Sequence, residues 1–383
     1  MRRPGASRPR RRLAAVLVPV AAVIVLAAGW VGLWYFGASV ADRTLAGWLD
    51  REAAAGRVYS CGSQSIGGFP LRIEVRCADA TATIKNLLPP LAVKAAGLTF
   101  TAAVWSPTRL VGEVAGPLTL ADLGQAPNLA ADWSLARLTV RGVPPDPDSV
   151  AVQLDAAHLD RVGNSQPIFQ TKHADLQGHL ASGTARDHPV VEVSLQLTGA
   201  TAPQFHSLLA EPVDAELYLT VRGLKDLSPK PWADRFREMQ SAPDSGIELK
   251  SLRMTRGDIV VVGTGTVNVN AHGKLDGLVR VAIVGIERLV PLIGIDRLIA
   301  QGIDRLAGSS GAAAQGVSAL DRLVPGLGGA LRNTANATMI ENLKKMGEPT
   351  SIDGKPALVL PLRFADGSVY FGMLRLGEVP PLF

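Results

Sequence analysis

The stretch that decides how this chain is organised is residues 13–36, LAAVLVPVAAVIVLAAGWVGLWYF. Its 24 residues carry no charge. At about 1.5 Å per residue, a helix of this length crosses a hydrocarbon core of roughly 30 Å. Six arginines precede it within residues 1–12, and basic residues beside a span stay on the cytoplasmic side of the membrane. The sequence therefore predicts a cytoplasmic basic tail at 1–12, a transmembrane anchor at 13–36 and an exported domain at 37–383.

A cleaved signal peptide is the alternative, because Ser39-Val40-Ala41 offers small residues at which a peptidase could cut. The apolar region of a signal peptide is roughly 7–15 residues long, which is much shorter than this one. A retained anchor is the favoured interpretation, and it places the aromatic residues between Trp30 and Phe36 in the far headgroup layer. In a bacterium, this describes a single-pass protein of the inner membrane whose main domain lies in the periplasm.

The positive charge of the chain is confined to its N-terminus. The formal net charge is +5, and removing the six arginines of residues 1–12 leaves −1 for the remainder. A nucleic-acid surface needs a basic patch that displaces counterions from phosphates, and no block rich in Lys or Arg follows Arg12. The composition therefore argues against DNA or RNA as a partner.

The two cysteines, Cys61 and Cys77, lie on either side of Gly67-Gly68-Phe69-Pro70. A hairpin turning around Phe69 would place them directly opposite each other, and the alternation of residues 71–77 puts Cys77 on the buried face of a strand. Export makes oxidation favourable, and closing this loop would contribute roughly 3 kcal/mol in the chain-entropy model. A structural disulfide is predicted, with two buried free thiols as the alternative.

The body of the chain has the pattern of a β protein. Across residues 57–227, short runs of alternating apolar and polar residues are separated by Gly, Pro, Asn and Asp. Such alternation is typical of strands with one buried face, and residues 191–197 are the cleanest example. Helices are expected at 40–55, at 231–240 and beyond residue 286. The predicted fold is mainly β with flanking α (α+β): a large, curved, mostly antiparallel sheet, open or closed into a barrel, partly covered by amphipathic helices.

A helical insertion is expected at about 286–346. Its first part repeats an apolar residue, an acid, Arg, Leu and a second apolar residue, as in residues 295–299, and each repeat makes one amphipathic turn. Two interpretations remain open: a helix that covers the sheet, and an amphipathic element that lies on a membrane or closes a groove. On the second interpretation, the candidate lipid-contact residues are Ile286, Leu289, Ile295, Leu298 and Ile299.

Two motifs, together with the anchor, resemble a known family. Residues 67–77 read GGFPLRIEVRC, and residues 361–372 read PLRFADGSVYFG, where Asp-Gly between apolar runs is typical of a hairpin. This arrangement resembles an uncharacterised bacterial domain-of-unknown-function family of exported single-anchor proteins, itself similar to AsmA-like envelope proteins. The resemblance covers nearly the whole chain and implies a β-rich periplasmic body, which in AsmA-like relatives is associated with lipid handling. The residues of the signature turn are Gly67, Gly68, Phe69, Pro70 and Arg72.

No motif in the chain announces a reaction. The Gly-x-Ser-x-Gly elbow, the His-Glu-x-x-His zinc motif and the phosphate-binding loop are all absent from the sequence, and the six histidines are scattered. We expect a non-enzymatic protein without catalytic residues, cofactor or metal, and an exported hydrolase is a minor alternative. Arg72 and Arg76 flank Glu74, which favours a cross-strand ion-pair ladder over a lipid-phosphate site.

The expected function is therefore that of a membrane-anchored periplasmic protein that contacts lipid or supports assembly of the cell envelope. Its expected partners are membrane lipid and envelope proteins. The alternative is a protein-interaction scaffold of an inner-membrane complex that binds no lipid.

Overall fold

The structure is a computed structural model of the chain. It describes residues 9–87, 89–143, 146–163, 167–228, 230–242, 244–293, 337, 340–341, 343–372 and 374–382. The chain forms two compact units, Met1–Ala130 (unit 1) and Ala131–Phe383 (unit 2), which are treated separately below. Strands dominate both units and pair in antiparallel fashion, so the predicted mainly-β fold class is confirmed.

Unit 1 begins with one long helix, α1 (Pro9–Ala54), of 46 residues. The predicted anchor and the predicted helix at 40–55 are parts of this single helix, because no proline lies between residues 20 and 54 to interrupt it. The helix ends before Gly56, whose φ of 81° is a left-handed conformation that glycine adopts without strain. By length and composition, α1 is a candidate membrane span.

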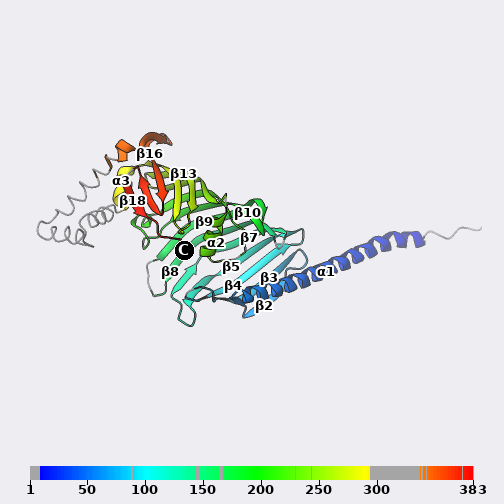
Figure 1. Cartoon of the computed structure of the whole chain (residues 1–383). Coiled ribbons are helices and arrows are strands. Elements are labelled where there is room, and N and C mark those ends of the chain that lie inside the picture. The colour runs from blue at the N-terminus through cyan, green and yellow to red at the C-terminus, as the bar shows by residue number, and fades with distance from the viewer. Residues whose placement is uncertain are drawn as a thin grey trace, which may run out of the picture. The chain divides into compact units, whose positions relative to one another are not determined.

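The two halves of α1 differ in burial. All side chains from Leu17 to Leu33 are exposed, whereas Trp34 is only 8% exposed. In Figure 1, the C-terminal half of α1 runs beside strands β2 (Ser63–Gly67) and β3 (Arg72–Ile84), and the N-terminal half extends beyond them. The body of unit 1 therefore begins at Trp34 on this helix.

The strands of unit 1 form an antiparallel array centred on β3. Its other members are β1 (Arg57–Ser60), β4 (Leu91–Ala103) and β5 (Ser106–Asp122), and β6 (Leu129–Asp132) lies at the boundary of the units. β3 pairs with β1, β2 and β4, and β4 pairs with β5. β3 also follows the direction of α1, because the Arg72 carbonyl meets Trp34 at one end and the Lys85 N–H donates to the Gly56 carbonyl at the other.

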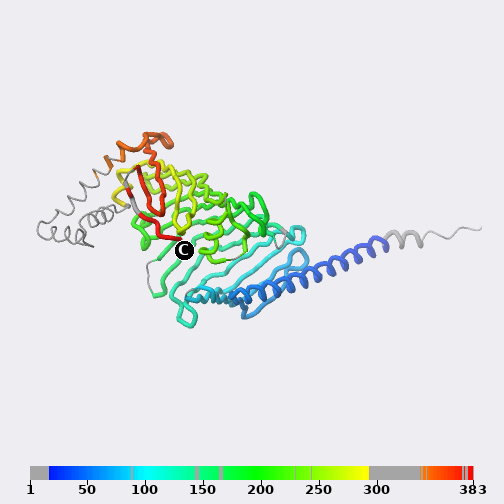
Figure 2. Tube along the Cα trace, in the orientation of Figure 1, coloured from blue at the N-terminus to red at the C-terminus, as the bar shows by residue number. Residues whose placement is uncertain are grey.

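Unit 2 contains an antiparallel meander in which each strand from β7 to β14 pairs with the next (Figure 2). These strands are β7 (Leu135–Val143), β8 (Asp146–Arg161), β9 (Pro167–Thr184), β10 (Asp187–Ala200), β11 (Val213–Arg222), β12 (Gly246–Arg256), β13 (Ile259–Val269) and β14 (Leu275–Val284). After β14 the order changes, because β16 pairs with β14, β15 and β17, and β17 pairs with β18. The last strands are β15 (Glu348–Ile352), β16 (Lys355–Ala365), β17 (Ser368–Phe371) and β18 (Leu374–Glu378).

The helices of unit 2 are few and short. They are the 3₁₀ turn η1 (Ser207–Leu209), α2 (Trp232–Ser241) and α3 (Ile286–Ile293). α2 confirms the helix predicted at 231–240. α3 is the start of the predicted insertion, and residues 294–336 lie outside the described part of the chain.

Burial in unit 2 is greatest around β13 and β14. Ile259 and Val261 belong to one buried cluster, while Val260 between them belongs to another. Successive side chains of a strand point to opposite faces, so both faces of the sheet are covered here.

Two Asp-Gly turns lie near the C-terminus, and the one at residues 366–367 confirms the hairpin expected there. Asp353 and Gly354 join β15 to β16, and Asp366 and Gly367 join β16 to β17. All four residues have positive φ, which two-residue hairpin turns of this kind require.

Candidate functional site

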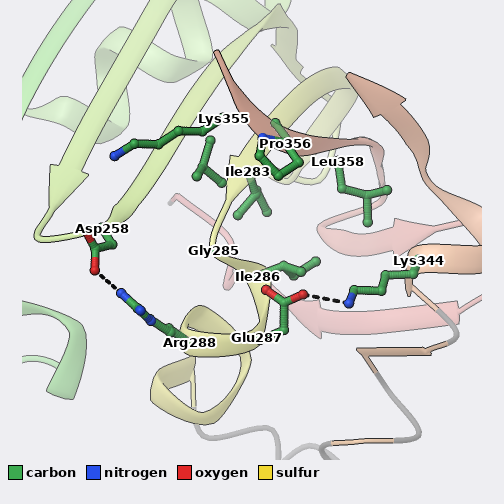
Figure 3. Close-up of a pocket in the computed structure, with 12 residues that line it drawn as sticks. Asp258, Ile283, Gly285, Ile286, Glu287, Arg288, Lys344, Lys355, Pro356 and Leu358 are labelled. Atoms are coloured by element: carbon green, nitrogen blue, oxygen red, sulfur yellow. Dashed lines mark hydrogen bonds and ion pairs between the residues drawn. The ribbon is translucent and has the colours of Figure 1, made fainter. Parts of the chain in front are cut away.

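A cleft in unit 2 lies where α3 leaves the sheet (Figure 3). Its volume of about 660 Å³ is within the range of small-molecule sites. The end of β14, the first turn of α3 and the start of β16 form most of its wall. Gly285 connects β14 to α3 with a φ of 74°, and a Cβ atom there would lie 3.3 Å from the carbonyl oxygen of Asp258.

Charged side chains surround the mouth of this cleft. They are Asp258, Glu287, Arg288, Lys344 and Lys355. Arg288 hydrogen-bonds to Asp258, and Lys344 Nζ lies 2.6 Å from Glu287 Oε1. These hydrogen bonds hold the pKa of Asp258 and the pKa of Glu287 below their usual values. Both carboxyl groups are therefore ionised at neutral pH. The mouth carries three basic residues against these two acids, and Lys355 is the basic residue outside the two pairs.

The inner wall of the cleft is apolar and includes Ile283, Ile286 and Leu358. The described side chains that line the cleft include no hydroxyl, thiol or imidazole group. An apolar wall below a cationic mouth fits a ligand with an apolar portion and an anionic end.

The predicted lipid-contact residues divide between buried and undescribed positions. Ile286 and Leu289 are buried in a core cluster with Val290 and Leu343. α3 thus packs its apolar face onto the sheet, as a covering helix does, and only the edge of Ile286 reaches the cleft. Ile295, Leu298 and Ile299 lie outside the described residues.

The signature turn of unit 1 packs against α1. Trp30 Nε1 donates to the Pro70 carbonyl at 3.0 Å, and Trp34 Nε1 donates to the Arg72 carbonyl at 2.8 Å. The Trp34 and Phe69 rings meet edge to face, with their centroids 5.5 Å apart. Gly68 of this turn has a φ of 94°, a conformation that favours glycine.

The predicted disulfide joins Cys61 to Cys77, with the Cα atoms 5.4 Å apart. The register that predicted it is wrong, because Cys77 pairs with Gln64 rather than with Cys61. Cys61 lies in the short segment between β1 and β2. The disulfide therefore links this segment to β3, which contains Cys77. The centre of the β2–β3 hairpin lies after Pro70, not at Phe69. The sequence pattern alone does not predict this shift in register.

The ion pairs around Glu74 run along one strand instead of across two. Glu74 is nearly buried, with Arg72 Nε 3.1 Å from Oε2 and Arg76 Nε 2.5 Å from Oε1. The predicted cross-strand ladder is therefore a ladder within β3. Both arginine side chains are more than half exposed.

The described histidines do not converge on a common site. His173 Nδ1 lies 2.6 Å from Asp155 Oδ1, His188 contacts its neighbour Asp187, and His206 accepts a backbone hydrogen bond at η1. Across the described part of the chain, no group of three or more His, Cys, Asp or Glu residues could hold a metal ion.

A family model described as "uncharacterized protein conserved in bacteria (DUF2125)" matches residues 34–380. The chain belongs to this family. The match covers most of the DUF2125 chain and begins at Trp34, the residue at which the body of unit 1 starts on α1. The resemblance to an uncharacterised bacterial family is thereby confirmed. No curated protein and no solved structure matches the chain.

Proposed function

We propose that this protein is a non-enzymatic, single-pass protein of the bacterial inner membrane whose periplasmic body contacts lipid and supports the cell envelope. The observation that carries the proposal is the length of free apolar helix ahead of Trp34. Residues 13–33 would extend for about 31 Å as a helix, which equals the thickness of a hydrocarbon core of about 30 Å. The apolar part of α1 ahead of Trp34 thus has the length of one membrane crossing.

The direction of insertion follows from charge and redox chemistry. Six arginines lie within residues 1–12 and favour a cytoplasmic N-terminus. The Cys61–Cys77 disulfide in the body favours an oxidising compartment. Both arguments favour a body in the periplasm.

Lipid contact is supported by the cleft beside α3. Its apolar wall suits an acyl chain, and the surplus positive charge at Lys355 suits an anionic headgroup. The expected similarity of the family to AsmA-like envelope proteins favours the same class of ligand.

The first experiment tests the anchor in cells that express the full chain with a C-terminal tag. The protein should stay in the membrane fraction at alkaline pH, and protease should reach the tag in spheroplasts. Leu26→Arg places a charge at mid-span, which costs about 2.5–3.5 kcal/mol on an insertion scale, and should reduce retention. Leu87→Arg, at an exposed site of the body, is the matched control. Release of the wild-type chain at alkaline pH would contradict the anchor.

The second experiment tests lipid contact by native mass spectrometry of the full chain extracted in mild detergent. A retained phospholipid mass supports the proposal. Lys355→Glu reverses the surplus charge at the cleft and should lower the retained fraction, whereas Lys85→Glu outside the cleft should not. A bare protein mass would contradict lipid contact.

A protein-interaction scaffold is the second candidate, and an exposed aromatic side chain favours it. Trp232 on α2 is exposed, and its ring lies 6.3 Å from that of Phe236. Exposed tryptophan is enriched at protein interfaces. Crosslinking from position 232 in intact cells should then trap specific envelope proteins, and their absence would contradict this candidate.

A further inference from the structure

Large apolar side chains are exposed at the end of unit 1 where the body meets α1. They come from two loops: the turn at residues 68–71 and the β4–β5 hairpin tip at residues 104–105. Phe69 is 51% exposed, Leu71 is 54% exposed and Trp105 is 72% exposed. Single exposed apolar residues are ordinary, but three on neighbouring loops require an explanation.

The two loops are held side by side by backbone contacts. The Val104 N–H donates to the Leu71 carbonyl at 3.1 Å. Arg72 pairs with Ala103 in the β3–β4 register, and Ala103 pairs with Ser106 across the hairpin. Phe69, Leu71 and Trp105 therefore belong to one end of the same sheet.

The indole hydrogen bonds fix this end of the sheet at a defined height along α1. Trp30 Nε1 donates to the Pro70 carbonyl at 3.0 Å. Trp30 follows Arg12 by 18 residues, which is about 27 Å of helix. With Arg12 at the inner boundary of a hydrocarbon core of about 30 Å, the Pro70 carbonyl lies near the outer boundary.

We infer that Phe69, Leu71 and Trp105 form a membrane-docking edge that enters the outer headgroup layer of the same bilayer that α1 crosses. The inference rests on the proposed membrane anchoring. The occupant of this edge is a phospholipid surface, because α1 continues from these contacts directly into its exposed apolar half. The amphipathic ring of tryptophan favours the boundary between the hydrocarbon core and the headgroup layer.

Two cations complete the chemistry of the docking edge. Arg72 follows the turn directly, and Arg109 lies just after the hairpin tip; both are exposed. Guanidinium groups bind phosphate oxygens through paired hydrogen bonds. These two arginines are therefore suited to bind lipid phosphates at the depth at which the apolar side chains enter the headgroup layer. The lipid class implied is any phospholipid, with anionic headgroups favoured.

The test uses single cysteines labelled with an environment-sensitive fluorophore. The two native cysteines are bonded to each other and none is free, so one introduced cysteine can be labelled alone. Trp105→Cys and Leu71→Cys report on the edge, and Val25→Cys reports on the span. Leu123→Cys is the matched control: it is 47% exposed and lies past the other end of β4, about 40 Å away along the strand.

The full chain of each variant is reconstituted in vesicles of phosphatidylethanolamine and phosphatidylglycerol, and quenching by aqueous iodide and by brominated lipid is measured. Labels at 105 and 71 should be about fivefold less accessible to iodide than the label at 123 and should be quenched by shallow brominated lipid. A shielded label at 25 with labels at 105 and 71 as accessible as the one at 123 would overturn the docking edge and leave the anchor intact. An iodide-accessible label at 25 would instead overturn the anchor, and the docking edge with it.

Discussion

At the scale of single residues, Trp34 is where the helix becomes part of the folded body. Its indole N–H donates to the Arg72 carbonyl, and its ring packs against Phe69. Trp34→Ala should destabilise unit 1 by about 3–5 kcal/mol, because a large buried ring is lost. Trp34→Phe keeps a ring and loses the hydrogen bond, at a cost of about 0.5–1.5 kcal/mol.

Hydrogen exchange of the β3 amides in the full chain, measured in detergent micelles, checks this order of effects. Leu33→Ala, one residue earlier and exposed, is the control and should change exchange little. Equal effects of Trp34→Ala and Leu33→Ala would show that α1 is not held at Trp34.

Glu52, in the last turn of α1, makes the stability of unit 1 depend on pH. Arg57 donates two hydrogen bonds to it, at 2.5 and 3.0 Å, and these lower the pKa of Glu52 from its usual value of 4.5. Because the folded-state pKa is depressed, this stabilisation is fully present above about pH 4.5 and is lost as the pH falls towards the folded-state pKa. Glu52→Gln should cost about 1–3 kcal/mol at pH 7.

Urea unfolding followed by pulse proteolysis, between neutral and acidic pH, measures the contribution of this pair. The difference between wild type and Glu52→Gln should shrink below pH 4.5. Asp50→Asn, on the same helical turn but exposed, is the control. A difference that persists unchanged at acidic pH would mean that the ion pair is not its source.

At the scale of elements, α1 and β3 approach closely at Gly37. A Cβ atom at Gly37 would lie 2.9 Å from Ile73 Cδ1, whereas no atom lies within 4 Å of the same position at Gly32. Gly37→Leu should therefore separate the helix from the strand and destabilise unit 1 by about 1–3 kcal/mol. Gly37→Ala should cost less, because the end of the Ile73 side chain can move.

Gly32→Leu, the matched control on the exposed half of α1, should leave β3 unchanged. Hydrogen exchange of residues 72–78 in the full chain is the readout. If Gly32→Leu and Gly37→Leu had the same effect, the packing of α1 against β3 would be wrong.

The strands and helices were predictable from the sequence wherever apolar residues recur with one clear period. The alternation of residues 191–197 predicts β10, and the Asp-Gly pair at residues 366–367 predicts the β16–β17 hairpin, because these signals are local. The β2–β3 register was not predictable: the position of a turn centre depends on the backbone at Gly68 and on contacts from α1. The hydrogen bonds from Trp30 and Trp34 to the turn were missed for the same reason. An indole N–H can donate equally well to a lipid headgroup and to a nearby backbone carbonyl.

The candidate cleft was less predictable than the strands. Its wall combines β14, α3 and β16, and Lys355 is separated from Asp258 by almost a hundred residues of sequence. Only the amphipathic turn at Ile286 gave a signal, and this turn left both a covering helix and a lipid-facing helix open. Tertiary packing with Leu343 and Leu358 decides for the covering helix.

At the scale of the whole molecule, the single disulfide gives the two units different sensitivities to reduction. Both cysteines of the chain lie in unit 1, with a sequence separation of 16. Opening a loop of this size should destabilise unit 1 by about 3 kcal/mol in the chain-entropy model. Unit 2 contains no cysteine, so its stability should not respond directly.

Pulse proteolysis of the full chain in urea, with and without reductant, separates these responses when the fragments are assigned to residues before and after Ala130. The unit 1 midpoint should fall on reduction while the unit 2 midpoint stays in place. A Cys61→Ser, Cys77→Ser double variant should reproduce the reduced midpoint and become insensitive to reductant, which excludes an effect of the reductant itself. If both midpoints fell together, the chain would unfold as one cooperative body, and the break at Ala130 would mark no boundary in stability.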